Sequence, residues 1–190
     1  GSIDGPGGNV LFSPVPAPNA EGRELLSPAQ RSKALGVQER PLGPARWGYV
    51  TSEDVYRAIL EHTPYWVHGL VGFGANVIMA HADTRRGRDA LAALDFYVHA
   101  DLFMNPTAEL ADVVLPVASP FEREALKIGF EGSQDAASFV QLRRKVVDPP
   151  GEARSDAEIV FGLAKRLGLG AQFWEGDIDA GNRFRLQGSG

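Results

Sequence analysis

The amino-acid sequence predicts a three-layer α/β fold with a mainly parallel sheet, preceded by a proline-rich extended arm. From residue 51 onward, short apolar runs alternate with amphipathic segments of helical spacing, and the connections between them are compact. This alternation is typical of a parallel sheet, because each crossover between parallel strands needs a long connection that is usually a helix. Before residue 51 prolines crowd together, which argues against long regular elements there.

The first fifty residues form the expected arm. The stretch FSPVPAPNAEG cannot hold a helix, because proline removes a backbone donor and forces the preceding residue into an extended conformation. Two interpretations stay open for this arm. It is either a flexible linker or a strap that packs on neighbouring structure through Val10, Leu11, Phe12 and Trp47.

The elements that follow are defined by their caps and apolar spacing. We expect strands over residues 69–74, 95–100 and 112–117, and helices over 52–62, 84–94 and 156–167. Thr51 or Ser52 caps the first helix, Ser155 and Glu158 form a capping box on the last, and Gly168 ends it. Two extended segments are expected on either side of a loop at 132–135.

These elements predict three regions. Residues 1–50 are the arm or linker, 51–170 the α/β domain, and 171–190 a C-terminal tail. The leading Gly1-Ser2 and the trailing Gly188-Ser189-Gly190 resemble cloning remnants, so we expect an excised piece of a longer protein.

The composition argues against several classes of function. The net charge is −5 and no long run of Lys and Arg occurs, so we expect no nucleic-acid binding. Cysteine is absent, which excludes disulfides, a thiol nucleophile and iron–sulfur or zinc-thiolate sites within this chain and fits a cytoplasmic location. No apolar stretch is long enough to span a membrane. The four histidines are scattered, so we predict no metal ligands and no catalytic residues here.

The first candidate site lies where the strand over 69–74 ends. The sequence GFGAN contains Gly72, Gly74 and Asn76, and glycines allow a backbone to approach a ligand closely. Ligands of open parallel sheets bind at the carboxyl ends of the strands. The third glycine of a dinucleotide-binding fingerprint is missing, so a plain tight turn between strand and helix remains an alternative.

The second candidate site begins at Asp101, which closes the strand over 95–100. A carboxylate there can accept two hydrogen bonds from a ligand, either from ribose hydroxyls or from the N1–H and exocyclic amine of guanine. Asn105 and Thr107 follow closely and could add polar contacts. The alternative is that Asp101 caps the helical turn NPTAELA.

The segments LVGFGAN and LDFYVHADLFMNPTAELADVVLPVASPFERE resemble the molybdopterin oxidoreductases of the dimethyl sulfoxide reductase type, which include formate dehydrogenases and nitrate reductases. The residues that match the family pattern in order are Leu94-Asp95-Phe96, Asp101, Phe103, Thr107-Ala108, Ala111-Asp112-Val113-Val114-Leu115-Pro116 and Glu122. GPGGNVLF near the start and PPGEARSDAEIVFGLAKRLG are also similar, so the likeness covers roughly residues 5–170.

This resemblance implies a Rossmann-like domain that holds one of two molybdopterin guanine dinucleotides. By position, Gly74 and Asn76 match the turn at the dinucleotide, Asp101 matches the carboxylate at the guanosine end, and Asn105 stands where the family often has Thr. The sequence departs from the family at Val77, which replaces a proline, at Asn105-Pro106, and in the loop after Glu122.

The leading interpretation is therefore a part of a molybdenum or tungsten oxidoreductase that holds the cofactor and is not catalytic alone. Its implied partners are the remaining domains of the parent enzyme, and the sequence does not identify an electron-transfer partner. Two alternatives stay open: a free-standing module that binds an ordinary nucleotide such as NAD, and a ligand-free scaffold whose arm docks a partner.

Overall fold

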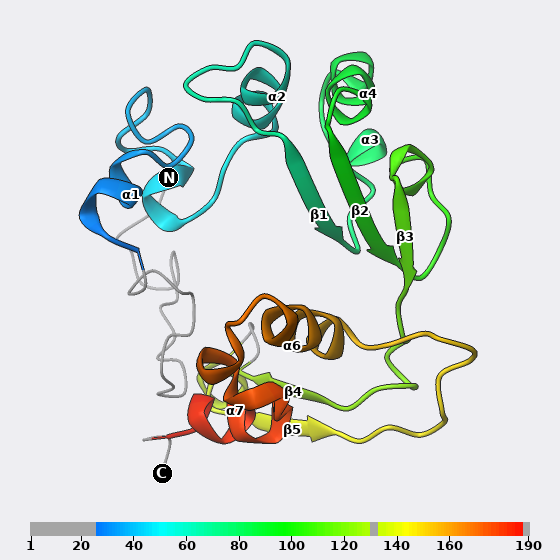
Figure 1. Cartoon of the computed structure of the whole chain (residues 1–190). Coiled ribbons are helices and arrows are strands. Elements are labelled where there is room, and N and C mark those ends of the chain that lie inside the picture. Colours follow the sequence, from blue (N-terminus) through cyan, green and yellow to red (C-terminus); the bar gives the residue numbers. More distant parts are fainter. Residues whose placement is uncertain (1–25, 130–132, 188–190) are drawn as a thin grey trace. The chain divides into compact units, whose positions relative to one another are not determined.

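The computed structural model describes residues 26–129 and 133–187 (Figure 1). Contacts between residues divide the chain into two compact units. The sheet unit comprises residues 26–118 and 150–156 of the described chain, and the hairpin unit comprises 119–129, 133–149 and 157–187. The boundary after Ala118 falls inside the single domain that the sequence predicted over 51–170.

The sheet unit contains three strands and the helices between them. Its elements are α1 (Pro28–Ser32), η2 (Pro44–Trp47), α2 (Ser52–Leu60), β1 (Gly69–Phe73), α3 (Val77–Ala80), α4 (Thr84–Ala92), β2 (Phe96–Asp101), η3 (Ala108–Leu110) and β3 (Val113–Pro116). The strands pair in the order β1-β2-β3, and both pairings are parallel. The predicted α/β fold with a parallel sheet is confirmed, and the three strands begin and end within two residues of the predicted bounds.

The register of the strands brings their carboxyl ends to one edge of the sheet. Phe73 at the end of β1 is opposite Ala100, and Asp101 at the end of β2 is opposite Pro116 of β3. All three arrowheads in Figure 1 point the same way. The loops that leave β1 and β2 therefore start side by side.

One face of the sheet is covered by α3 and α4. Tyr97 of β2 is buried with Ile78 of α3 and Leu91 of α4, and Leu70 of β1 packs against them. Burying such side chains supplies most of the free energy that holds helix to sheet.

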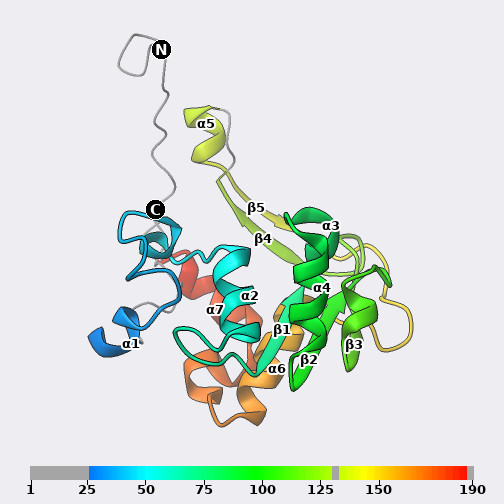
Figure 2. The same cartoon turned by 90° about the horizontal axis from the view of Figure 1, so that it is seen from above.

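Helix α2 lies beside α4, as both views show (Figures 1 and 2). Tyr56 and Ile59 of α2 pack against Ala90 of α4. A Cβ atom on Gly87 would lie 2.9 Å from the Tyr56 hydroxyl oxygen, so a glycine at this position permits the close approach of the two helices.

The opposite face of the sheet carries exposed apolar side chains. Val71 is 47% exposed, Phe96 53% and Val113 40%. Within the sheet unit the described residues thus form two layers, and the third layer stays a prediction. The Rossmann-like description stays a prediction with it.

Residues 26–50, the described part of the predicted arm, are joined to α2 by charged side chains. Asp54 of α2 is buried and forms a salt bridge with Arg40, and Arg57 of α2 forms one with Glu39 at 2.9 Å. These residues hold only a short α-helix and a short 3-10 helix. Val10, Leu11 and Phe12 lie outside the described residues, as does the Trp47 side chain, so the strap through these four residues stays a prediction.

The hairpin unit contains β4 (Ala125–Ile128), α5 (Gln134–Ala137), β5 (Val140–Arg143), α6 (Asp156–Arg166), η4 (Gly170–Gly176) and α7 (Ile178–Arg185). Strands β4 and β5 pair antiparallel, which agrees with the two extended segments expected around a loop. Gly168 has φ +78° and ends α6 as predicted.

The predicted C-terminal tail contains helices. Helix α7 and the end of η4 pack aromatic rings on α6, with Trp174 stacked on Phe161 at 6.1 Å between centroids and Phe184 5.3 Å from Trp174. A Cβ atom on Gly181 would lie 3.1 Å from the Trp174 ring, so the missing side chain makes room for the indole. None of the helices in the described residues has the length and apolar character that a membrane crossing requires.

Candidate functional site

The predicted site residues lie on the two loops that leave β1 and β2 at the carboxyl edge of the sheet. Gly74 has a left-handed backbone with φ +56°, and its amide donates a hydrogen bond to the Ala100 carbonyl at 2.9 Å. Apart from Gly74 itself and its two chain neighbours, no described residue has an atom within 4 Å of where its Cβ would stand. The backbone at Gly74 is therefore open to close approach.

Gly72 has a different role in the structure. A Cβ atom there would lie 3.0 Å from Nδ1 of His99 and 3.3 Å from the hydroxyl oxygen of Tyr97. The missing side chain of Gly72 thus makes room for two side chains of the neighbouring strand. This packing explains the glycine without any ligand.

Asn76 and Thr107 join the two loops. The Thr107 hydroxyl donates to Oδ1 of Asn76 at 2.9 Å and accepts from the Ile78 amide at 3.0 Å. Thr107 is fully buried. Its hydroxyl therefore fixes the position of one loop relative to the other and is itself already satisfied.

The Asp101 carboxylate is bonded on both oxygens. Oδ1 accepts from the amides of Leu102 at 2.6 Å and Phe103 at 3.2 Å. Oδ2 accepts from the Asn105 side-chain amide at 2.9 Å and lies 3.2 Å from Nε2 of His99. The side chain is 13% exposed. The structure thus brings Asp101 and Asn105 together, with a small part of the carboxylate at the surface.

Asn105 is the residue that caps the following turn. Its Oδ1 accepts from the amides of Thr107 at 2.9 Å and Ala108 at 3.0 Å, the first residues around η3. Asp101 therefore does not bond to the amides of this turn itself, as the alternative expected, but acts on the turn through Asn105. Asp101 fixes the start of the loop and holds the residue that does the capping.

The network also sets the protonation of its members. Burial alone would raise the pKa of Asp101, but hydrogen bonds from the Phe103 amide, His99 and the Leu102 amide outweigh it and lower that pKa. Burial, with a smaller contribution from Asp101, raises the pKa of Tyr97 to about 12. Asp101 is accordingly ionised and Tyr97 protonated at neutral pH.

Tyr97 and His99 belong to this site, although the sequence analysis did not select them. Both are buried, and the Tyr97 hydroxyl lies 2.6 Å from Nδ1 of His99. The available signal was the spacing of two in FYVHAD, which puts Tyr97, His99 and Asp101 on the same face of one strand.

The loop between Asp101 and Asn105 presents apolar side chains to the surface. Leu102 is 48% exposed, Phe103 76% and Met104 64%, and the Asp101 carboxylate holds the backbone amides of Leu102 and Phe103. An ordered loop that offers an aromatic ring beside an anionic group can hold a ligand with both a flat apolar part and hydrogen-bond donors.

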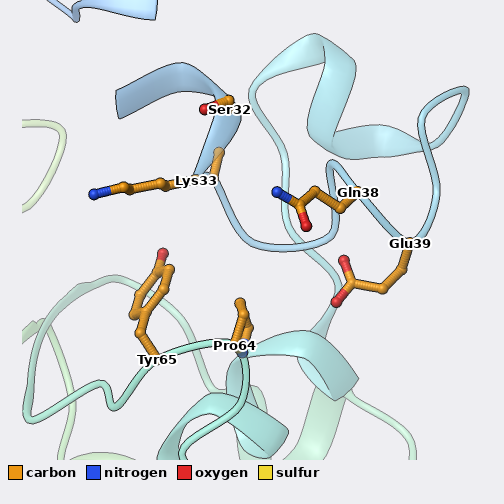
Figure 3. Close-up of a pocket in the computed structure, with 7 residues that line it drawn as sticks. Ser32, Lys33, Gln38, Glu39, Pro64 and Tyr65 are labelled. Carbon is orange, nitrogen blue, oxygen red and sulfur yellow. The ribbon is translucent and has the colours of Figure 1, made fainter. Parts of the chain in front are cut away.

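A pocket of about 420 Å³ lies elsewhere in the sheet unit, between residues 32–39 and Pro64-Tyr65 (Figure 3). The Lys33, Gln38 and Tyr65 side chains around it are exposed, and Glu39 is already paired with Arg57. None of the predicted site residues lines it. The hydrogen-bonded strand ends, rather than this pocket, form the candidate site.

Comparison with known proteins identifies the family. The sequence model of the molybdopterin oxidoreductase family matches residues 34–166, which is more than half of the chain. This chain belongs to the molybdopterin oxidoreductase family. The matched segment contains all six predicted site residues, and membership in this family implies a molybdopterin cofactor.

Relatives of this molybdopterin oxidoreductase chain include enzymes with different reactions. The dopamine dehydroxylase of Eggerthella lenta is 32% identical over 193 residues, covering 97% of this chain and 18% of that protein. The alpha subunit of an F420-dependent formate dehydrogenase from Methanocaldococcus jannaschii is 43% identical over 100 residues, covering 53% of this chain and 14% of that subunit.

A solved structure of a longer protein also matches this chain over part of its length. Acetylene hydratase from Pelobacter acetylenicus superimposes with a TM-score of 0.62 at 29% identity, over 71% of this chain and 18% of that one. The chain thus spans less than a fifth of the length of these relatives.

Proposed function

We propose that this chain is the part of a molybdenum or tungsten oxidoreductase that holds one guanosine end of a bis(molybdopterin guanine dinucleotide) cofactor. The observation that carries the proposal is the hydrogen-bonded edge of the sheet. Thr107 and Asn76 tie together the two strand-end loops, and Gly74 leaves the backbone open between them. Carboxyl edges of parallel sheets are where nucleotides bind in such folds.

The residues at this edge fit a guanosine in part. Gly74 offers a backbone without a side chain to obstruct a ligand. Asp101 offers an ionised acceptor that a guanine donor can reach at Oδ2, because Oδ1 already accepts from two backbone amides. Because Oδ2 of Asp101 already accepts from the Asn105 amide, a guanine can bond there only by displacing that amide.

This chain would contribute binding and orientation rather than chemistry. When bound, the cofactor supplies a redox-active metal. The chain has no cysteine to ligate that metal or an iron–sulfur cluster, and we assign it no catalytic residue. The remaining domains of the parent enzyme are its proposed partners, consistent with relatives more than five times as long.

Isothermal titration of the purified chain with GDP, ADP and NAD tests the proposal. We expect GDP to bind at least tenfold more tightly than ADP, because guanine has an N–H donor at N1, whereas adenine N1 is an acceptor and would face the carboxylate. Tighter binding of NAD would instead indicate an ordinary nucleotide-binding module. No heat with any nucleotide would indicate a scaffold without a ligand.

The substitution Asn105→Thr tests how a guanine reaches Asp101. A threonine hydroxyl can still cap η3, but it removes the amide that occupies Oδ2 of Asp101. We expect the affinity for GDP to rise roughly 2- to 10-fold, because the ligand no longer replaces an existing hydrogen bond. An unchanged GDP affinity in a folded variant would remove Asp101 from the contact.

A further inference from the structure

His99 lies in the interior of the sheet unit, directly behind the candidate site. Its side chain is fully buried on the central strand β2, between Tyr97 and Asp101 on the same face. Both ring nitrogens have polar neighbours: the Tyr97 hydroxyl at 2.6 Å from Nδ1 and Oδ2 of Asp101 at 3.2 Å from Nε2. A buried imidazole with two such neighbours is held in one orientation.

The proton positions follow from the two neighbours. An ionised carboxylate only accepts hydrogen bonds, so Nε2 must carry a hydrogen to face Oδ2 of Asp101. In the neutral ring Nδ1 then accepts, and the Tyr97 hydroxyl donates to it. Tyr97 keeps its proton to a pKa of about 12, so its hydroxyl has a hydrogen to donate at neutral pH. Tyr97, His99 and Asp101 therefore form one directed chain of hydrogen bonds.

The neighbouring strand β1 leaves room for this series of hydrogen-bonded side chains. Gly72 of β1 is opposite His99, and any Cβ there would come within 3.0 Å of Nδ1. The contact would push the ring away from Tyr97 or from Asp101. A glycine at this position and a tyrosine two residues before the histidine both favour one placement of the imidazole.

We infer that His99, backed by Tyr97, is the positioning residue for Asp101 in the guanosine-binding site, an inference that rests on the function proposed above. Asn105 and His99 share Oδ2 of Asp101. When a guanine displaces the Asn105 amide, the His99 bond remains on that oxygen. His99 thus keeps the carboxylate plane fixed and ionised while its surface partner is exchanged for the ligand.

Two substitutions separate this role from simple filling of space. His99→Gln retains an amide donor at about the place of Nε2, whereas His99→Leu has a similar volume and no donor. In the full chain without ligand, ¹³C NMR of the Asp101 carboxyl group reports its pKa. We expect that pKa to be raised in the Leu variant and close to wild type in the Gln variant. Equal values in both variants would overturn the inference.

The affinity for GDP supplies the second readout. We expect it to fall about tenfold in the Leu variant and to be largely retained in the Gln variant, because a charge-assisted hydrogen bond is lost only in the former. Equal GDP affinities in both would also overturn the positioning role. If the wild-type chain binds no GDP, the proposed function fails, while the carboxyl pKa still decides whether His99 holds Asp101.

A third variant keeps the test usable if His99→Leu does not fold. Tyr97→Phe retains the ring and removes only the hydroxyl that donates to Nδ1. We expect ¹⁵N NMR of the His99 imidazole to change from a hydrogen-bonded to a free Nδ1 acceptor. An unchanged imidazole spectrum would show that Tyr97 does not hold the ring and would overturn the directed chain.

Discussion

At the scale of single residues, Asp101 organises the loop that follows β2 with both of its carboxylate oxygens. Its Oδ1 holds the amides of Leu102 and Phe103, while Oδ2 holds the side chains of Asn105 and His99. A carboxylate has about four acceptor positions, so all are in use within the chain. The proposed binding of guanosine would therefore be coupled to the loop structure through one side chain.

The substitution Asp101→Asn should destabilise the chain even without a ligand. The NH₂ group of the new asparagine would face the NH₂ group of Asn105. The Asn105 side chain cannot rotate by 180° to relieve this contact, because its oxygen caps η3. We expect the free energy of unfolding at pH 7 to fall by about 1–3 kcal/mol, the cost of an unmet buried donor. Urea denaturation measures this difference.

The same experiment at low pH carries a definite sign. The folded-state pKa of Asp101 lies below its ordinary value of 3.8. The stability that the ionised form contributes is therefore fully present above about pH 4 and is lost as the pH falls through the folded-state pKa. The difference between wild type and variant should shrink over that range. Asp89→Asn, at an exposed position of α4, is the matched control and should change the stability by less than about 0.5 kcal/mol.

At the scale of elements, a buried carboxylate of helix α2 connects this helix to the segment that precedes it. Asp54 accepts hydrogen bonds from the Arg40 guanidinium and, at 2.6 Å, from the Thr51 hydroxyl. Its other carboxylate oxygen lies 3.5 Å from the Arg57 guanidinium. Thr51 also caps the helix by accepting from the Asp54 amide. The Arg40 contact ties the loop before α2 to the first turn of that helix.

We expect Asp54→Asn to lower the free energy of unfolding by about 1–3 kcal/mol, because it removes the charge that Arg40 and Arg57 share. Glu53→Gln on the same helix turn is the control. Glu53 is 60% exposed and pairs only at the surface with Arg86, so its loss should cost less than about 1 kcal/mol. Equal melting temperatures for the two variants would contradict the account of Asp54.

The elements that the sequence predicted well are those with local signals. Thr51 as a cap, Gly168 as a terminator and the apolar runs of the three strands all act within a few residues, so they can be read without the fold. The role of Gly72 could not, because it is explained by the Tyr97 and His99 side chains of a neighbouring strand. Helix α7 was missed because its packing depends on Phe161, more than a dozen residues earlier.

In the candidate site, too, some features could be predicted from the local sequence and others depend on the fold. Placing Asp101 and Asn105 at a strand end required only the order of elements, and their proximity is found in the structure. Which carboxylate oxygen binds which donor could not be predicted, because it depends on the exact path of the loop.

At the scale of the whole molecule, the chain consists of two units and is shorter than its relatives. The sheet unit has apolar side chains on one face, with Phe96 53% exposed, and β5 of the hairpin unit is exposed along its length. Such surfaces are typical of proteins that pack against further structure. They fit the proposal that this chain works together with other domains of a molybdopterin oxidoreductase.

The central claim is that the strand ends, and not the pocket near Tyr65, bind the guanosine end of the cofactor. The most direct test follows the backbone amide resonances of the ¹⁵N-labelled chain during titration with GDP. We expect shifts that saturate at Gly74, Asn76 and residues 101–107, and none at Lys33 or Tyr65. Shifts confined to the pocket, with the strand-end resonances unmoved, would contradict the account.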